Sequence, residues 1–419
     1  MRPNRRTFLG TIGTLAAAAP VWSNPPSERV RIAVIGCRGR GSDLAAGFAQ
    51  NPSSQVVAIC DVDDAGIAKG MKAVEGKGGE TPRAEKDFRK LLDDRSIDAL
   101  AIATPDHWHA PMAILGCLAG KDVYSEKPAS HNLIEGRRMV QAARKHNRVV
   151  QIGTQRRSAT FIQDATQHVR SGEIGKVGQA RAWINQQRKI DVSGSPQPVP
   201  SSIDYDLWQG PAQERPYIPS RFNYNWHWFW NWGTGELGNN GIHGVDVARW
   251  GLGVDTPLRV TSGGGAYVFP GIEVPDTQVV TWEFADTSIV WEHRMWSRHG
   301  LEGGSFGIAF YGDNGTVLID DKGWRVVDGP GGDAGGKPSE SQSAHFANFL
   351  ECVKTRKQPN ADVEIGHLST RLCHLGNIAH RLGRKLTFDG ATETFPGDDE
   401  ANKLLGREYR QGFELPAIA

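Results

Sequence analysis

The amino-terminal third of the chain alternates between apolar runs and amphipathic segments. Residues 29–36 read RVRIAVIG, a β-branched run ending in glycine, and residues 97–104 read IDALAIAT. Continuous apolar runs of this kind are typical of strands buried on both faces of a parallel sheet. Residues 132–147 (NLIEGRRMVQAARKHN) carry apolar side chains at helical spacing. The alternation predicts an α/β fold with a doubly wound, Rossmann-type parallel sheet over 29–153.

A glycine-rich turn follows the first strand and opens a helix. Gly36, Gly39 and Gly41 lie in this turn, but Arg38 stands where the dinucleotide-binding pattern G-x-G-x-x-G has its second glycine. Glycines at such a turn let backbone N–H groups close on a pyrophosphate at the amino end of the helix. Because a plain strand-to-helix turn would also use glycines, the turn alone is a weak indication.

An acidic residue strengthens the dinucleotide interpretation. Asp61 ends the second predicted strand, at the distance from Gly41 where a carboxylate accepts hydrogen bonds from the adenosine ribose hydroxyls. A carboxylate there repels a 2′-phosphate, which favours NAD over NADP. Arg38 and Arg40 could contact phosphate, and this weakens the preference. Strand, turn and acid together predict that the chain binds a dinucleotide, with NAD favoured over NADP.

Two later stretches follow predicted strands at their carboxyl ends, the rim where ligands bind in open parallel sheets. They read ATPDHWHAPMAI (103–114) and YSEKPAS (124–130). This pair, with Glu126-Lys127-Pro128, resembles the Gfo/Idh/MocA oxidoreductase family, the glucose–fructose oxidoreductase and inositol dehydrogenase group. The resemblance continues to the end of the chain, through DYDLWQGPAQERPY (204–217) and DDEANKLLGREYR (398–410).

The resemblance implies that the Rossmann domain is followed by an α/β domain, here 154–419, with a large, mostly antiparallel open sheet. It implies that the nicotinamide lies between the two domains and that Lys127 contacts the reacting hydroxyl and the nicotinamide ribose. An ammonium suits that place because it can stabilise a developing alkoxide. The further cofactor contacts expected near this rim are Thr104, Pro105, His109, Glu126 and Gln155.

A helical segment in the second domain carries the candidate base. The sequence GNNGIHGVDVARWGL places Asn239 and His243 one helical turn apart. Family members commonly have Asp-x-x-x-His here, and the resemblance makes His243 the group that takes the proton of the substrate hydroxyl. A neutral imidazole suits that role near neutral pH. Asn239 replaces the aspartate, so it can only orient the ring or cap the helix, and this puts a proton relay in doubt.

An aromatic cluster precedes this helix, in the stretch NWHWFWNW over 225–232. If the stretch is extended, its four tryptophans face one way, and indole faces stack well on sugar rings. The alternative is that these rings fill an interdomain core or an oligomer interface. The candidate substrate contacts are Trp228, Trp230, Arg156 and Asp246, although Arg156 could instead form a structural ion pair. His243 and Asp246 lack a third metal ligand nearby, so no metal site is expected.

The chain between 193 and 219 is a long proline-rich connection. Connections of this length are uncommon unless they cover a site or form an interface. After residue 258, alternating runs such as SIVWEHRMW predict successive strands. The five cysteines match no zinc-site spacing and are expected to be small buried residues, with a disulfide as the alternative.

The first residues predict a targeting segment over 1–24. The paired Arg5 and Arg6 precede a mildly apolar run, a pattern that resembles a twin-arginine export signal. The run is shorter than the ~20 apolar residues that cross a bilayer, so no membrane insertion is expected. The protein would then use the twin-arginine export machinery and act in the periplasm or otherwise outside the cytoplasm. A chance Arg-Arg pair at a terminus is the alternative.

These features favour one function and leave two alternatives. The main hypothesis is an exported NAD(P)-dependent oxidoreductase acting on a hydroxyl of a sugar, sugar derivative or glycoside. NAD is favoured over NADP, and the cofactor is expected to be tightly bound because free NAD is scarce outside the cytoplasm. The first alternative is a redox-neutral, NAD-dependent glycosidase or lyase, and the second is a non-catalytic carbohydrate-binding or sensor protein. The formal net charge of +1 gives no electrostatic case for nucleic acid. A homo-oligomer is expected only by analogy with the family.

Overall fold

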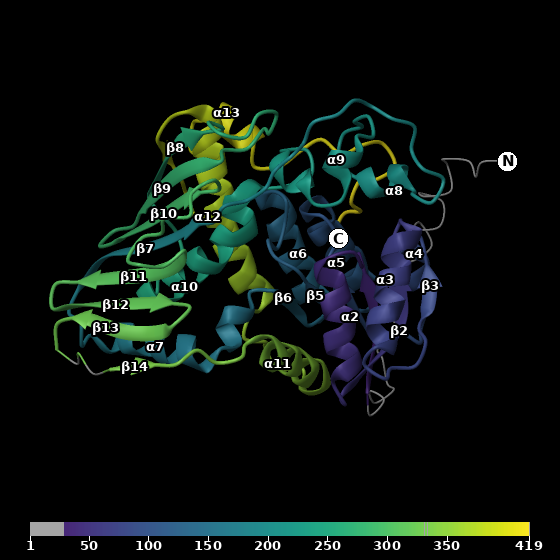
Figure 1. Ribbon diagram of the computed structural model, residues 1–419, viewed down its shortest axis with the longest axis horizontal. Helices are drawn as coiled ribbons and strands as arrows, with labels where there is room; N and C mark the ends of the chain where they lie inside the picture. The colour runs from purple at the N-terminus through teal and green to yellow at the C-terminus, as the bar shows by residue number, and fades with distance from the viewer. Residues whose placement is uncertain (1–28, 331, 333, 419) are drawn as a thin grey trace.

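Two β-sheets organise the chain (Figure 1). The computed structural model describes residues 29–330, 332 and 334–418. The predicted export signal over 1–24 lies outside these residues and stays a prediction. Within the described residues, no helix combines the length and the apolar character that a membrane span requires.

The first sheet is entirely parallel, with strand order β3-β2-β1-β4-β5-β6. This is the strand order of a Rossmann fold, so the predicted doubly wound sheet is confirmed. Its buried strands are the apolar runs of the sequence. The strands are β1 (Val30–Ile35), β2 (Ser54–Cys60), β3 (Arg83–Glu85), β4 (Ala99–Ile102), β5 (Asp122–Ser125) and β6 (Val150–Ile152). The connecting helices are α2 (Arg40–Gln50), α3 (Asp64–Glu75), α4 (Arg89–Leu92), α5 (Asp106–Leu118) and α6 (Leu133–Lys145).

The second sheet has nine strands in the order β14-β13-β12-β11-β7-β10-β9-β8-β15. Only β7 and β10 pair in parallel, which confirms the predicted mostly antiparallel sheet. The strands are β7 (Val177–Asn185), β8 (Arg259–Gly265), β9 (Thr277–Glu283), β10 (Ser288–Arg294), β11 (Phe306–Gly312), β12 (Gly315–Asp320), β13 (Gly323–Asp328), β14 (Gly335–Gly336) and β15 (Leu386–Thr387).

Helices from the second half of the chain cover one face of this sheet and join it to the first. Helices α7 (Thr160–Ser171), α10 (Ile242–Leu252) and α12 (Val363–Leu382) share an apolar core with its strands. In Figure 1, α12 runs between the two sheets. Helix α11 (Gln342–Thr355) instead packs its phenylalanines against the Rossmann sheet. The second half of the chain is therefore anchored on the first at several places.

The long connection between β7 and the aromatic cluster, residues 186–224, covers the carboxyl end of the Rossmann sheet (Figure 1). We call it the covering segment; it contains the short helices α8 (Tyr205–Gln209) and α9 (Pro219–Phe222). The Asp204 N–H donates to the Val62 carbonyl oxygen at 2.9 Å, directly after strand β2. His107 Nε2 lies 2.9 Å from the Trp208 carbonyl oxygen and so holds α8 against α5.

The carboxyl-terminal residues, which follow α13 (Asp399–Lys403), fasten the covering segment from outside. Arg410 Nη1 donates to Asp206 in α8 at 2.6 Å, and Arg407 Nε donates to Glu135 in α6 at 3.0 Å. The Phe413 ring packs edge-to-face on an indole of α5. This tail therefore ties the covering segment to the Rossmann domain.

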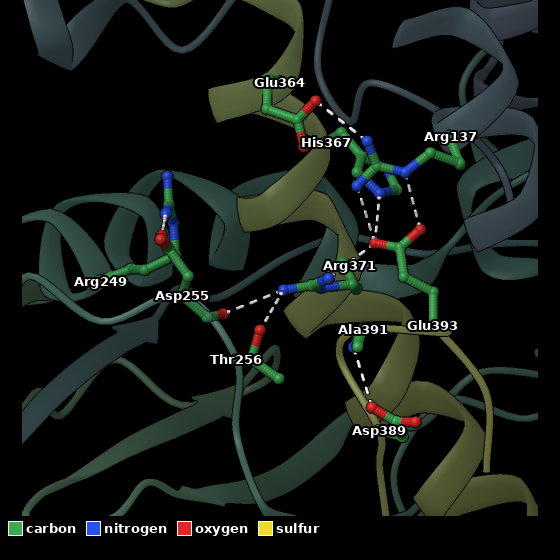
Figure 2. Close-up of polar contacts among 10 residues, drawn as sticks. All are labelled: Arg137, Arg249, Asp255, Thr256, Glu364, His367, Arg371, Asp389, Ala391 and Glu393. Carbon is green, nitrogen blue, oxygen red and sulfur yellow. Dashed lines mark hydrogen bonds and ion pairs between the residues drawn. The ribbon is translucent and has the colours of Figure 1, made fainter. Parts of the chain in front are cut away.

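A cluster of ion pairs joins α6 to the second half of the chain (Figure 2). Glu393 accepts hydrogen bonds from Arg137 Nε and Nη2, at 2.8 and 3.0 Å, and from Arg371 Nη1 at 2.6 Å. His367 Nε2 lies 2.9 Å from the same carboxylate. Arg371 and His367 come from α12, so one carboxylate holds the two halves of the molecule together.

The five cysteines are all buried and free. Their prediction as small buried residues is confirmed, and the alternative of a disulfide is wrong for this structure. Among the described residues, no cluster of three or more His, Cys, Asp or Glu side chains is arranged to hold a metal ion.

Candidate functional site

A cavity of about 340 Å³ lies along the carboxyl ends of the parallel strands, beneath the covering segment. Its volume is within the ~300–1,000 Å³ usual for small-molecule sites. Residues of both sheets' domains and of the covering segment line it. The sequence-predicted residues among them are Gly36, Arg38, Gly39, Arg40, Asp61, Thr104, Pro105, His109, Glu126, Lys127, Gln155, Asn239 and His243.

The glycine-rich turn has the shape of a phosphate cradle. Gly36 has φ +81°, and a Cβ there would lie 2.8 Å from the Ala103 carbonyl oxygen. A Cβ on Gly41 would lie 1.7 Å from the Gly36 oxygen, so both positions require glycine. Gly41 does not line the cavity itself but packs behind Gly36. Gly39, which precedes helix α2, has open space around its Cβ position. Backbone N–H groups at a helix start that faces open space fit a pyrophosphate.

Asp61 supports this turn as well as facing the cavity. Its carboxylate accepts hydrogen bonds from the backbone N–H of Cys37 at 2.6 Å and of Asp63 at 3.0 Å. Burial raises the pKa of Asp61 to about 6, against the opposing effects of the hydrogen bond from Cys37 and of the Arg38 charge. Each carboxylate oxygen keeps a further lone pair, so ribose hydroxyls can still donate to it.

The two arginines of the turn are already paired with acids. Arg38 forms an ion pair with Asp63. Arg40 Nε donates to Glu126 at 2.7 Å, and its Nη1 donates to Gln342 at 2.6 Å. Burial alone would lower the pKa of Arg40, but the Glu126 charge outweighs it and raises that pKa. These pairings tie the glycine-rich turn to the rim residue next to Lys127.

Lys127 is held at the junction by the helix that carries the candidate base. Its Nζ donates to the Asn239 carbonyl oxygen at 2.7 Å and to Asn239 Oδ1 at 2.9 Å. Burial lowers the pKa of Lys127, while the carboxylates of Glu126, Asp106 and Glu236 act in the opposite direction. An ammonium has three N–H donors, so one donor is left for a ligand in the cavity.

His243 lines the same cavity. Its Nδ1 is buried, and neither ring nitrogen meets a hydrogen-bond partner among the residues that the structure describes. Burial lowers the pKa of His243 well below the ordinary value, and the positive charge of Lys127 acts in the same direction. His243 is therefore a neutral imidazole with an uncommitted lone pair, beside a buried lysine.

Asn239 does not orient His243, which corrects one expectation from the sequence. The segment Leu237–Gly241 is a π-helical turn (η3) rather than part of a regular α-helix. The wider turn means that the i, i+4 spacing does not bring the Asn239 side chain against the imidazole. The amide contacts Lys127 and, at 3.4 Å, Glu236. Asn239 therefore positions the lysine.

His109 and Thr104 shape the floor of the cavity. The His109 ring nitrogens lie 2.7 Å from the Pro128 carbonyl oxygen and 2.8 Å from the Thr104 carbonyl oxygen. This ring holds the Lys127–Pro128 loop against the start of α5. The Thr104 hydroxyl is buried and has no partner in the described structure, so it can bond to a ligand.

The four candidate substrate residues are not among the residues that line the cavity. Residues Asn225–Trp228 form a 3₁₀ turn (η2), so the tryptophans do not share one face of a strand. Trp228 is fully buried in an aromatic core, and Trp230 packs against that core. The Arg156 guanidinium lies 4.2 Å from the centre of the Phe306 ring. Direct contact of these four residues with a substrate therefore stays a prediction.

Asp246 is part of a buried ion pair. Arg157 donates to it through Nε and Nη2, both at 2.8 Å, and the Ser369 hydroxyl donates to it at 2.5 Å. Asp246 and Arg157 are 1% and 6% exposed, so no water replaces a lost contact. Asp246, three residues after His243, thus faces the core of the second half of the chain.

Replacing Asp246 with asparagine is expected to lower the free energy of unfolding by about 2 kcal/mol, because hydrogen bonds to a charged group contribute ~1.5–3 kcal/mol. Denaturant unfolding measures this loss. Asp164→Asn, the same change at an exposed position in α7, is the control and should have no effect. An unchanged stability of Asp246→Asn, with a raised KM, would show that Asp246 contacts substrate after all.

The covering segment and the turn after it supply residues that the sequence did not single out. These include Trp208, Phe222, Tyr224, Trp226 and His227. For the first three, the only signal was the unusual length of the proline-rich connection, whereas Trp226 and His227 lie in the aromatic stretch 225–232. No spacing rule connects such a loop to particular positions in the cavity, so individual residues could not be named.

Models of one protein family match both halves of the chain. Residues 30–154 match an oxidoreductase family with an NAD-binding Rossmann fold. Residues 178–267 and 337–415 match the C-terminal α/β domain of the same family. The two matches together cover more than half of the chain: the first contains the whole parallel sheet, and the second contains strands β8 and β15 of the second sheet and all but the first residue of β7.

Curated relatives match over shorter stretches. A glycosyl hydrolase family 109 protein 2 of Shewanella sp. (strain ANA-3) is 33% identical over 115 residues, 26% of this chain and 25% of that protein. A glycosyl hydrolase family 109 protein of Stenotrophomonas maltophilia (strain K279a) is 32% identical over 140 residues, 31% of this chain and 30% of that protein. The chain thus covers about a quarter to a third of the length of these relatives.

Solved structures match over most of the chain. The WlbA dehydrogenase from Bordetella pertussis, solved with NADH and UDP-GlcNAcA, has a TM-score of 0.66 at 21% identity, over 86% of this chain and 99% of that one. The aldose-aldose oxidoreductase from Caulobacter crescentus, solved with glycerol, has a TM-score of 0.65 at 20% identity, over 86% of this chain and 100% of that one. At these identities the likeness shows the shared fold.

Proposed function

Because the chain belongs to the Gfo/Idh/MocA oxidoreductase family, we propose that it is an exported, NAD-dependent enzyme that oxidises a hydroxyl of a sugar, sugar derivative or glycoside. The observation that carries the proposal is that Lys127 and His243, from opposite halves of the chain, line one cavity with the glycine-rich turn. The UDP-GlcNAcA complex of the similar WlbA dehydrogenase supports this class of substrate.

Each residue has a defined part in this proposal. The glycine-rich turn and Asp61 would hold NAD, whose nicotinamide, when bound, accepts a hydride from the carbinol carbon. His243 takes the hydroxyl proton on its unpaired ring nitrogen. Lys127 donates a hydrogen bond to the oxygen as negative charge develops on it. Asn239 keeps the lysine in place through two hydrogen bonds.

NAD rather than NADP is the proposed cofactor. Asp61 and Asp63 both lie directly after β2, where a 2′-phosphate would meet their negative charge. Arg38, the nearest cation of the turn, is paired with Asp63. Mass spectrometry of the denatured, purified protein tests this: it should release NAD, because export of a folded protein requires the cofactor to be bound beforehand. Release of NADP, or of no dinucleotide, would contradict it.

The pH dependence of turnover should reflect the environment of His243. Since burial lowers its pKa well below ~6.5, the imidazole stays neutral, and able to accept a proton, as the pH falls from 8 to about 6.5. We expect kcat/KM to be unchanged over this interval and to fall only at more acidic pH. Circular dichroism at each pH checks that the fold is intact. An acid limb with its midpoint at or above about 6.5 would contradict the role of His243.

A second candidate function is a redox-neutral glycosidase that oxidises a sugar carbon transiently and then reduces it again. The glycosyl hydrolase family 109 relatives favour it. Incubation of the protein as purified with nitrophenyl glycosides separates the two functions. The glycosidase releases nitrophenol without any added carbonyl acceptor, whereas the oxidoreductase produces a reduced nicotinamide or needs an acceptor for further turnovers. A sensor would bind sugar and do neither.

Export and assembly belong to the same proposal. Arg5 and Arg6 support transport by the twin-arginine machinery to the periplasm or beyond. Fractionation of cells that express the full chain, compared with an Arg5→Lys, Arg6→Lys variant, tests this, because the variant should stay in the cytoplasm. A homo-oligomer through the open sheet is proposed by family analogy, and light scattering of the purified protein measures it.

A further inference from the structure

A second histidine, His227, lines the cavity that contains Lys127 and His243, and the proposed reaction does not use it. It comes from the 3₁₀ turn η2 at the end of the covering segment. The residue is only 8% exposed. A buried imidazole on a cavity wall needs a structural reason or a ligand, because each ring nitrogen that lacks a partner costs free energy.

One edge of the ring has a partner and the other does not. His227 Nδ1 lies 2.6 Å from the Tyr224 carbonyl oxygen. Since a carbonyl oxygen only accepts, Nδ1 carries the proton, and Nε2 of the neutral ring has a lone pair. Nε2 meets no hydrogen-bond partner among the described residues. The contact with Tyr224 thus fixes the tautomer and leaves an acceptor.

The ring is also held in one orientation. It stacks on the Trp226 indole with ring centres 3.6 Å apart and an angle of 19° between the planes. Behind it, a Cβ on Gly233 would lie 2.6 Å from the His227 Cα, so the chain passes too closely for anything but glycine. Because the ring is already fixed, a ligand that bonds to Nε2 does not have to immobilise a mobile side chain, which would cost free energy.

Burial and the neighbouring charges keep His227 Nε2 unprotonated, so it remains a hydrogen-bond acceptor. Burial lowers its pKa well below the ordinary value. The hydrogen bond to Tyr224 opposes this, while the positive charges of Lys127 and Arg188 act with burial. Nε2 therefore stays unprotonated at neutral pH. Its partner in a ligand must be a donor, and a sugar hydroxyl is such a group.

We propose that His227 is a specificity-determining residue, whose Nε2 accepts a hydrogen bond from a sugar hydroxyl other than the one that is oxidised. The inference rests on the proposed function and assigns to His227 the recognition of a second hydroxyl of that substrate. A site built to accept from a hydroxyl discriminates against the analogue that lacks it, because the buried acceptor is then left unpaired.

Two variants of similar shape test the loss of the acceptor at Nε2 separately from any effect on folding. His227→Asn places an amide N–H near the position of Nδ1 and can keep the Tyr224 contact, but it removes the acceptor at Nε2. His227→Gln places an amide oxygen near Nε2. We expect His227→Asn to raise KM about tenfold with kcat within about threefold of wild type, and His227→Gln to recover most of this loss. Thermal unfolding of both variants verifies that they fold.

The substrates for this test are methyl β-D-glucopyranoside, its galacto, manno and xylo counterparts, and the monodeoxy analogues of whichever is oxidised fastest. One deoxy analogue should have the same kcat/KM with wild type and His227→Asn, because the hydrogen bond is absent in both. Two results would overturn the proposal. One is that wild type and His227→Asn have equal KM values with every sugar. The other is that the difference between the two proteins persists undiminished with every deoxy analogue.

The same sugars distinguish a failure of this inference from a failure of the proposed function. Calorimetry with the NAD-loaded protein measures a dissociation constant whether or not the sugar is oxidised. Binding without oxidation overturns the proposed function alone, and His227 is then judged by a tenfold difference in dissociation constant between wild type and His227→Asn. A loaded protein that binds none of these sugars overturns both.

Discussion

Replacing Lys127 with methionine is expected to lower kcat about a thousandfold, the upper range for loss of one donor to a developing oxyanion. Methionine keeps the length and apolar stem of the side chain and removes the ammonium. The loss should fall on kcat, because the charge on the oxygen develops only in the transition state. Steady-state kinetics with the fastest sugar of the panel measures it.

The control for this variant is Lys90→Met. Lys90 makes the same kind of contact, 3.0 Å from Glu85, but its side chain is 66% exposed and outside the cavity. The Lys90→Met variant should turn over substrate at the wild-type rate. Mass spectrometry of denatured Lys127→Met shows whether NAD is still bound, which separates lost chemistry from lost cofactor. Turnover within tenfold of wild type, with NAD bound, would contradict a catalytic lysine.

Replacing Glu393 with alanine is expected to lower the free energy of unfolding by about 3–5 kcal/mol, the cost of removing one member of a buried charge network. Its carboxylate accepts from Arg137, Arg371 and His367 (Figure 2). Arg371 is almost fully buried, so its guanidinium would lose its counter-ion without gaining water. Denaturant unfolding, followed by tryptophan fluorescence, measures the change.

The same residue gives a pH dependence of stability with a definite sign. Burial alone would raise the pKa of Glu393, but its hydrogen bonds to Arg137 and His367 and the neighbouring positive charges hold it well below the ordinary range. A carboxyl group with a lowered pKa stabilises the fold fully above its unfolded value of ~4.3, and this contribution is lost as the pH falls towards the folded value. The difference in stability between wild type and Glu393→Ala should therefore shrink below pH 4.

Glu364→Ala is the matched control. Glu364 contacts the same Arg137 at 3.0 Å, but its side chain is 33% exposed and makes this single ion pair. An ion pair of this kind contributes at most ~1 kcal/mol. If Glu364→Ala and Glu393→Ala lower the free energy of unfolding equally, the Glu393 carboxylate is not the main source of stability in the network of Figure 2.

The sequence predicted the Rossmann sheet and its rim well because both depend on local rules. A buried parallel strand must be apolar on both faces, and its carboxyl end fixes where the chain emerges. The glycine-rich turn, Asp61, Thr104 and Lys127 are each adjacent to such an end, so strand prediction alone brought them together. They all line the cavity.

Residues of the second half were predicted less well because their neighbours are distant in sequence. Asp246 follows His243 by less than one turn, yet it pairs with Arg157 from another element. The aromatic stretch was assigned as a possible strand, but it forms a 3₁₀ turn wedged among side chains of the covering segment. Periodicity cannot distinguish a cavity wall from a core when both are apolar.

What the sequence determined by itself is the alternation of strands and helices, the glycine-rich turn, and a lysine and a histidine that both line the cavity. What only the tertiary structure decided is which side chains share a cavity: that Asn239 holds Lys127 instead of His243, and that the covering segment brings His227 to the same wall. The physical reason is that local structure follows from the spacing of a few neighbouring residues, whereas contacts across the cavity depend on how two sheets and a 39-residue connection, 186–224, pack together.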